Sequence, residues 1–224
     1  MKAELLDVFG NDLMVVNTAR VSMGKWHGKI DYATDPKLIK YLAQNGHWSP
    51  FAHPRAQFLL ELPIFVARQW EKHRIGAVRG YDIYDQNEIS RRYVDSEPEF
   101  WAPCQWRSRP EGSIKQGSGP ALPEEVSSRV DCMYQDALGI ARTIYDQMLG
   151  LGVAPEQARA VLPVCTYTSW IETGSLAYWA RVCSLRVNGH AQQEIRELAR
   201  QVYEQMADQF PISWEALMGA ADGN

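Results

Sequence analysis

Guanidinium, imidazole and amide groups gather in a few short segments of the sequence, each beside apolar residues. The segments are SPFAH (49–53), RQWEKHR (68–74), NEISRRY (87–93), ARAVLP (158–163) and LRVNGHAQQEIR (185–196). An arginine that is fixed by apolar packing holds its fork of N–H donors in one direction, which suits a phosphate or a planar imide. Taken singly, such an arginine is more often part of a surface salt bridge. Together, the segments indicate a site for a small anionic ligand.

The stretch from Lys72 to Tyr93, KHRIGAVRGYDIYDQNEISRRY, mixes cationic with acidic residues. It directly follows LPIFVARQW (62–70), whose apolar content and Pro63 predict a buried helix. A charge run of this kind is usually a solvated loop with scattered ion pairs. Because this one follows a buried helix, it is also a candidate donor-rich loop around a ligand.

The elements that position these segments are mostly helices. Gly10 ends a strand and Asn11 can cap the helix that follows. Apolar periodicity and turn residues predict helices over 13–22, 34–46, 62–73, 123–150, 155–163, 174–187 and 190–208, and strands over 2–9, 53–63 and 167–173. The aromatic residues in the apolar stripe of the 123–150 helix, Tyr134 and Tyr145, are expected in the core. Residues 101–123, rich in Pro, Gly and Ser, are expected to form an exposed loop. The predicted helices and strands together indicate an α+β fold in a single domain over 1–224.

The overall composition excludes several classes of protein. Of 224 residues, 46% are hydrophobic and 22% are charged, which is a globular composition. A formal net charge of -4 gives no basic field to hold a nucleic acid. The sequence shows neither a signal peptide nor an apolar run of about 18 residues. No membrane partner is therefore expected, and the protein is expected in the cytoplasm.

The four cysteines fit neither zinc pairs nor a compact disulfide framework, so no metal site is expected. Cys132 and Cys183 lie in helical apolar patterns and are expected in the core. Cys165, beside Pro163, is expected to be more exposed.

The order of the motifs resembles that of a known family. RQW-x-x-HR is followed by NE-x-S-x-RY, with PF-x-H before and LR-x-x-x-HAQ-x-EIR after. This pattern, from about residue 5 to about 214, is similar to that of the flavin-dependent thymidylate synthases. The resemblance implies a compact, helix-rich α+β domain with a small, mostly antiparallel sheet. It also implies a homotetramer whose active sites are shared among subunits.

The resemblance assigns two sets of site residues. The implied FAD contacts are His53, Lys72, His73, Arg74, Asn87, Glu88, Ser175 and His190. The implied dUMP contacts are Gln69, Glu88, Ser90, Arg91, Arg92, Arg159 and Arg186. Arg186, Glu88 and Gln69 are the implied catalytic residues. Ser90 is an alternative nucleophile, but no His–Asp partner lies near it in the sequence, which favours phosphate binding.

The implied reaction is the reductive methylation of dUMP to dTMP, with methylenetetrahydrofolate and NADPH as co-substrates and FAD as cofactor. Two alternatives stay open. One is an enzyme that methylates or hydroxymethylates another pyrimidine deoxynucleotide, such as dCMP. The other is a relative that binds flavin or nucleotide without catalysis.

The sequence departs from the family pattern at several positions. Lys72 stands where the family usually has arginine, and Arg91 where it often has glycine. Ser175 and Arg181 stand at positions of flavin-contacting asparagines. Residues 77–85 are an insertion, which we expect to modulate ligand entry without supplying catalytic groups. A plain surface excursion, and an edge strand over YDIYD (81–85) at a subunit boundary, are the alternatives.

Overall fold

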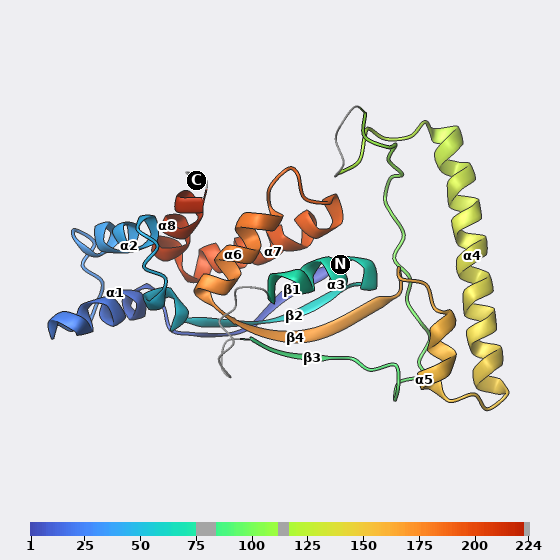
Figure 1. Ribbon diagram of the computed structural model, residues 1–224, viewed down its shortest axis with the longest axis horizontal. Helices are drawn as coiled ribbons and strands as arrows, with labels where there is room; N and C mark the ends of the chain where they lie inside the picture. Colours follow the sequence, from blue (N-terminus) through green and yellow to red (C-terminus); the bar gives the residue numbers. More distant parts are fainter. Residues whose placement is uncertain (75–83, 112–116, 222–224) are drawn as a thin grey trace. The chain divides into compact units, whose positions relative to one another are not determined.

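The computed structural model describes residues 1–74, 84–111 and 117–221 and has an α+β fold (Figure 1). The strands β1 (Lys2–Phe9), β2 (Arg55–Pro63), β3 (Tyr84–Glu88) and β4 (Tyr167–Ser175) form an antiparallel sheet in the order β1-β2-β4-β3. The helices are α1 (Asp12–Arg20), α2 (Asp35–Gln44), α3 (Ile64–Trp70), α4 (Glu124–Gly150), α5 (Pro155–Ala158), α6 (Leu176–Arg186), α7 (Gln193–Gln209) and α8 (Pro211–Ala221). Short 3-10 turns are η1 (Val21–Met23), η2 (Ser49–Ala52), η3 (Glu71–Arg74) and η4 (Arg159–Val161). The expected helix-rich fold with a small antiparallel sheet is confirmed.

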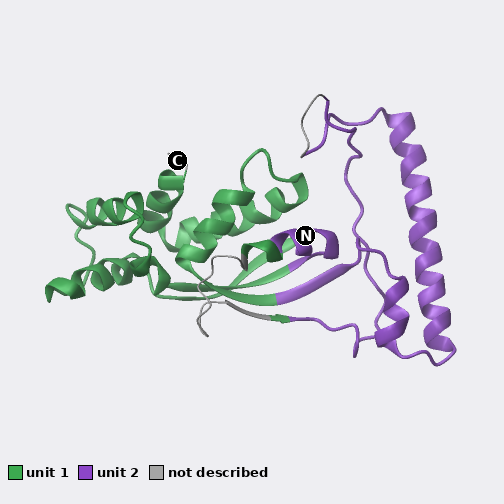
Figure 2. Cartoon of the chain, in the orientation of Figure 1, with its two compact units in different colours: residues 1–60, 71–87, 171–224 green, residues 61–70, 88–170 purple. Residues whose placement is uncertain are grey.

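The chain divides into two compact units (Figure 2). Unit 1 contains residues 1–60, 71–87 and 171–224, and unit 2 contains residues 61–70 and 88–170. Because β2 and β4 each have residues in both units, the division runs through strands and not through a linker. The single domain over 1–224 stays a prediction.

The core of unit 1 forms around Trp179 of α6. Its ring centroid lies 4.8 Å from that of Phe58 on β2 and 5.1 Å from that of Tyr178. Its indole N–H donates to the backbone oxygens of Ala56 and Gly174, each at 3.1 Å, so the one polar atom of the ring is bonded although buried. Helix α7 packs on both α6 and β1 (Figure 1). Burial of a side chain of this kind contributes about 2 to 3 kcal/mol.

The turn from β4 into α6 is fixed by buried polar contacts. Ser175 is the N-cap of α6, and its hydroxyl accepts from the Tyr178 N–H at 3.1 Å. The Tyr178 hydroxyl in turn donates to the buried carboxylate of Glu172. Gly174 is required beside them, because a Cβ there would overlap the Tyr178 ring. Helix α6 therefore leaves the sheet in one direction, with Arg186 at its last position.

The first strand is bonded to α7, which lies near the other end of the chain. The Ala3 N–H donates to Gln201 Oε1 at 2.8 Å, and the Leu5 N–H donates to Gln205 Oε1 at 2.9 Å. Gln205 Nε2 donates back to the Ala3 carbonyl at 2.9 Å. Two glutamines on successive helical turns thus fix the N-terminal strand in unit 1.

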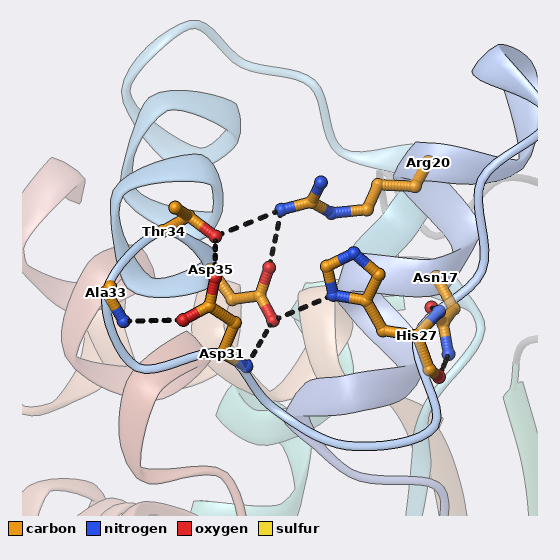
Figure 3. A network of polar contacts seen from close by, with 7 residues as sticks. All are labelled: Asn17, Arg20, His27, Asp31, Ala33, Thr34 and Asp35. Atoms are coloured by element: carbon orange, nitrogen blue, oxygen red, sulfur yellow. Dashed lines mark hydrogen bonds and ion pairs between the residues drawn. The ribbon is translucent and has the colours of Figure 1, made fainter.

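A polar network fixes the segment between α1 and α2 (Figure 3). The buried Asp35 carboxylate accepts from Arg20 at 2.6 Å and from the Asp31 N–H at 2.8 Å. The Asn17 amide bonds both the N–H and the carbonyl of His27, at 2.8 and 2.9 Å. Burial alone would raise the pKa of Asp35, but the bonds from Asp31 and Arg20 outweigh it and hold the pKa below its ordinary value. A buried, charged carboxylate with its partners thus joins the two helices.

The long helix α4 packs on α5 and η4 in unit 2. Of its residues, Leu138 and Tyr145 are buried, whereas Met133 and Ile140 are 64% and 61% exposed. Of the two tyrosines expected in the core, Tyr145 is buried as expected and Tyr134 is half-buried. The described helices include none that is both long enough and apolar enough to cross a membrane.

The cysteines differ in part from expectation. Cys132 on α4 is exposed and Cys165 is buried, so both expectations are wrong, whereas Cys183 is buried as expected. Cys165 is covered because its carbonyl accepts from the Trp101 N–H at 2.9 Å and Tyr134 also bonds Trp101, at 2.6 Å.

Helix α8 has no counterpart in the sequence-based prediction. The carboxylate of Asp12 accepts from the N–H groups of Ile212 and Ser213 at 3.0 and 2.9 Å, which satisfies donors at the start of α8. This cap comes from the opposite end of the chain.

Two expected irregular segments are only partly described. Within the loop 101–123, residues 107 and 121 pair as an isolated antiparallel bridge. Of the insertion 77–85, residues 77–83 lie outside the described residues, and Tyr84 and Asp85 begin β3.

Candidate active site

In unit 1, the end of α6 meets η3. The Nε–H of Arg186 donates to Nε2 of His73 at 2.5 Å, with His73 buried and Arg186 half-buried. Burial, together with the positive charges of Arg186 and Arg181, lowers the pKa of His73 to about 4. The imidazole is therefore neutral at physiological pH, and its Nε2 lone pair can accept the bond.

This contact sets the direction of the Arg186 side chain. A guanidinium carries five N–H donors in a rigid fork, so a bond through Nε orients the whole group. Burial lowers the pKa of Arg186, yet a guanidinium remains a cation in a protein. The structure thus brings together one residue expected to contact the nucleotide and one expected to contact the flavin.

The other expected flavin contacts in unit 1 differ in their surroundings. His53, Lys72, Asn87 and His190 are exposed. The His190 N–H donates to the Asn188 side chain at 3.0 Å. Ser175, by contrast, is buried and uses its hydroxyl to cap α6. The side chain of Arg74 lies outside the described part of the chain.

In unit 2, the end of β3 is tied to β4 by its side chain and its backbone. The Thr168 hydroxyl donates to Glu88 Oε1 at 2.5 Å. One residue further, the Ile89 N–H donates to the Ser169 carbonyl at 2.9 Å. Thr168 is buried and Glu88 is exposed, so an exposed carboxylate is bonded to a fixed, buried hydroxyl.

A tight turn follows Glu88 and leads to two of the expected phosphate contacts. The Tyr93 N–H donates to the Ser90 carbonyl at 3.0 Å, and the Arg92 N–H donates to the Ser90 hydroxyl at 3.3 Å. Arg92 Nε lies 3.6 Å from Glu156 Oε2, while Arg159 Nε donates to the Glu156 carbonyl at 3.3 Å. Arg92 and Arg159 therefore meet at one residue, Glu156.

The two remaining expected nucleotide contacts lie in unit 2 as well. Arg91 donates through Nη1 to the Ser96 carbonyl at 2.9 Å. Gln69 is half-buried near the end of α3.

Two residues of unit 2 bond the expected site residues but were not predicted from the sequence. Thr168 is a polar residue at an inward position of the alternating strand YTSWIET, which is the signal that could have found it. Glu156 lies three residues before Arg159, so the two share a helix face. The sequence position of Thr168 or of Glu156 does not show which side chain of a distant segment it bonds.

Solved structures with this fold include a nucleotide methylase. The UMP/dUMP methylase PolB from Streptomyces cacaoi, bound with 5-Br dUMP, aligns with a TM-score of 0.83 and 29% identity over 97% of this chain and 94% of that chain. A second structure of PolB, bound with 5-Br UMP, has a TM-score of 0.84 and 28% identity, over 98% of this chain and 94% of that chain.

Sequence comparison gives the family. The family model of the thymidylate synthase complementing protein, Thy1, matches residues 4–212. The flavin-dependent thymidylate synthase of Thermosipho africanus is 34% identical over 96% of this chain and 89% of the relative. That of Thermus thermophilus is 35% identical over 95% of this chain and 73% of the relative. The chain belongs to the Thy1 family of flavin-dependent thymidylate synthases, which confirms the resemblance seen in its motifs.

Proposed function

We propose that this chain is a flavin-dependent thymidylate synthase that methylates dUMP to dTMP, with methylenetetrahydrofolate as carbon donor and NADPH as reductant. The observation that carries the proposal is the contact between Arg186 and neutral His73. It joins a residue of the proposed nucleotide site to a residue of the proposed flavin site. Membership of the Thy1 family supports the same reaction.

The residues of unit 1 suit a flavin dinucleotide. Lys72 and Arg181 are exposed cations on the two elements that meet at His73, and cationic donors complement a pyrophosphate. FAD, when bound, supplies the hydride that completes the new methyl group. We assign its binding to His53, Lys72, His73, Arg74, Asn87 and His190. Ser175 is a weaker candidate, because its hydroxyl already caps α6.

We assign the nucleotide to two groups of residues, one for its phosphate and one for its base. Arg92 and Arg159 neutralise its phosphate, with Ser90 and Arg91 as further donors. Gln69, Glu88 and Arg186 contact the pyrimidine. Arg186 stabilises the negative charge that develops on a uracil carbonyl when C5 acts as the nucleophile.

A second candidate substrate is UMP. The observation that favours it is the likeness to PolB, a UMP/dUMP methylase whose structures hold both 5-Br dUMP and 5-Br UMP. At 29% identity the ribose contacts of the two proteins can differ, so both nucleotides belong in the test.

The test is a product assay on the purified full chain. It contains labelled methylenetetrahydrofolate, NADPH and FAD, with dUMP, UMP and dCMP in separate reactions. Labelled dTMP is the expected product. Labelled 5-methyluridine monophosphate would show that UMP is also a substrate. A product from dCMP alone, or a hydroxymethylated product, overturns the proposal in favour of a related reaction. A yellow protein without any product favours a binding role.

We also propose that the chain forms a homotetramer. The exposed apolar residues of α4, which include Val126, Met133, Ile140 and Ile144, support this proposal, because such a stripe is typical of a subunit interface. Size-exclusion chromatography with light scattering should give four times the 25.5 kDa mass of one chain. A stable monomer that stays colourless with added FAD contradicts both the assembly and the proposed flavin site.

A further inference from the structure

We infer that Thr168 is a positioning residue that orients the carboxylate of Glu88 for the bound nucleotide. The inference rests on the proposed function, in which Glu88 contacts the pyrimidine. It adds a residue that touches no ligand itself and acts through its hydrogen bond to Glu88.

The geometry fits a fixed donor and a movable acceptor. Thr168 is 7% exposed on β4, and its Oγ1 lies 2.5 Å from Glu88 Oε1, a distance typical of a charge-assisted bond from a hydroxyl to a carboxylate. Glu88 is exposed at the last position of β3, where a free side chain would sample several rotamers. The backbone bond between Ile89 and Ser169 holds the two strands in register at this point. The hydroxyl therefore selects one direction for the carboxylate.

Threonine suits this task for two reasons. Its β-branched side chain is restricted at χ1, so the hydroxyl points in a set direction while the methyl group packs. An ionised carboxylate only accepts hydrogen bonds, so the hydroxyl proton is committed to Oε1 and Oε2 becomes the oxygen that faces a ligand donor. A shift of about 1 Å in such a group is enough to reduce the rate of a reaction strongly.

The decisive variant is Thr168→Val, which removes the hydroxyl and keeps the shape. Thr168→Ser restores the hydroxyl. Thr166→Val is the matched control. Thr166 is also buried, but its hydroxyl donates to a nearby backbone group, the Pro163 carbonyl, at 2.7 Å. All three variants are made in the full chain loaded with FAD. Turnover with dUMP and the dissociation constant of dUMP by calorimetry are measured for each.

We expect Thr168→Val to lower kcat/KM for dUMP by about 10- to 100-fold, the loss typical of a hydrogen bond to a charged group. Its dissociation constant for dUMP rises by about threefold or more, since the carboxylate is no longer held in place. Thr168→Ser and Thr166→Val stay within about threefold of the wild type in both measurements.

A double-mutant cycle with Glu88→Ala identifies the route of the effect. If Thr168 acts through Glu88, Thr168→Val weakens dUMP binding no further once Glu88 is alanine. Equal and additive effects in both backgrounds overturn the inference, as does a Thr168→Val variant that behaves like Thr166→Val.

The outcomes separate this inference from the proposed function. A wild type that binds dUMP without turnover overturns the proposed reaction, and the binding measurements alone then decide the role of Thr168. A wild type that turns over, with Thr168→Val unaffected, overturns only the role of Thr168. A wild type that binds no dUMP overturns both.

Discussion

The two units hold their candidate site residues in contrasting ways. In unit 1, His73 is 4% exposed and lies 2.5 Å from Arg186. In unit 2, the side chains of Arg92 and Glu156 are 52% and 55% exposed, and their charged atoms are 3.6 Å apart. The first contact is a part-buried hydrogen bond, and the second is an open surface ion pair.

This difference shows how burial divides the work of a site. A buried group has its protonation state and direction set by the fold, before a ligand arrives. An exposed ion pair contributes little to stability and is screened by salt, so a phosphate can replace its carboxylate at low cost. In the proposed function, the contact between His73 and Arg186 is preorganised for chemistry, and the pair of Arg92 and Glu156 is adaptable for capturing an anion.

The largest expected effect tests the preorganised side. Arg186→Ala should lower kcat/KM for dUMP, because it removes about 2 to 4 kcal/mol of transition-state stabilisation. FAD should stay bound. Steady-state kinetics and the flavin absorbance of the purified protein measure the two effects. Arg200→Ala, which removes an exposed arginine of α7, is the control and should leave both unchanged. Loss of flavin with unchanged nucleotide affinity would reverse the assignment of Arg186.

A second effect comes from the neutral state of His73. The unfolded chain binds a proton at His73 below a pKa of about 6.5, whereas the folded chain does so only near 4. The free energy of unfolding should therefore be highest above pH 6.5 and fall by up to about 3 kcal/mol as the pH falls toward 4. Urea denaturation between pH 7 and 4.5 measures this slope. His73→Gln should flatten it, and an equally steep slope in the variant would contradict the neutral, buried imidazole.

A pair of glycines compares the packing of the two units. Gly174 lies against Tyr178 and Trp179 in unit 1, so Gly174→Ala should destabilise the protein by about 1 to 3 kcal/mol through overpacking. Gly139 lies on α4 in unit 2, where an added Cβ meets nothing within 4 Å. Gly139→Ala should therefore stabilise by about 0.5 to 1 kcal/mol through helix propensity. Denaturant midpoints measure both, and equal effects would remove the contrast in packing.

The smallest expected effect belongs to the open ion pair of unit 2. Glu156→Ala should change the free energy of unfolding by less than about 0.5 kcal/mol, because the pair with Arg92 is exposed. The affinity for dUMP, measured by calorimetry, should stay the same or rise, since Arg92 loses a competing carboxylate. A clear loss of stability would show that this pair is more than a surface contact.

Local elements of the fold could be predicted from the sequence. Asn11 caps α1 as expected, accepting from the Met14 N–H at 3.2 Å. The start of α2 was placed correctly, but the Thr34 hydroxyl donates to Asp31 and forms no cap bond. Local signals therefore placed the helix ends, and a neighbouring acceptor changed how one end is bonded.

Contacts between distant segments could not be predicted from the sequence. The start of α8 depends on Asp12, which lies about 200 residues earlier in the chain. The bond between Thr168 and Glu88 depends on the register of β3 against β4, which no spacing in either strand reveals. The candidate site residues were predicted from motifs, whereas the partners that they bond needed the fold.

The glutamines of α7 have a consequence for how copies of this chain can associate. β1 lies at one end of the sheet order, and the open edge of such a strand is a template on which another chain can add a strand. The amides of residues 3 and 5 are already bonded by Gln201 and Gln205, so an incoming strand finds these donors occupied. Strand addition along this part of the edge, and the aggregation that it leads to, is thereby blocked. Copies of the chain then associate through surfaces other than this part of the β1 edge.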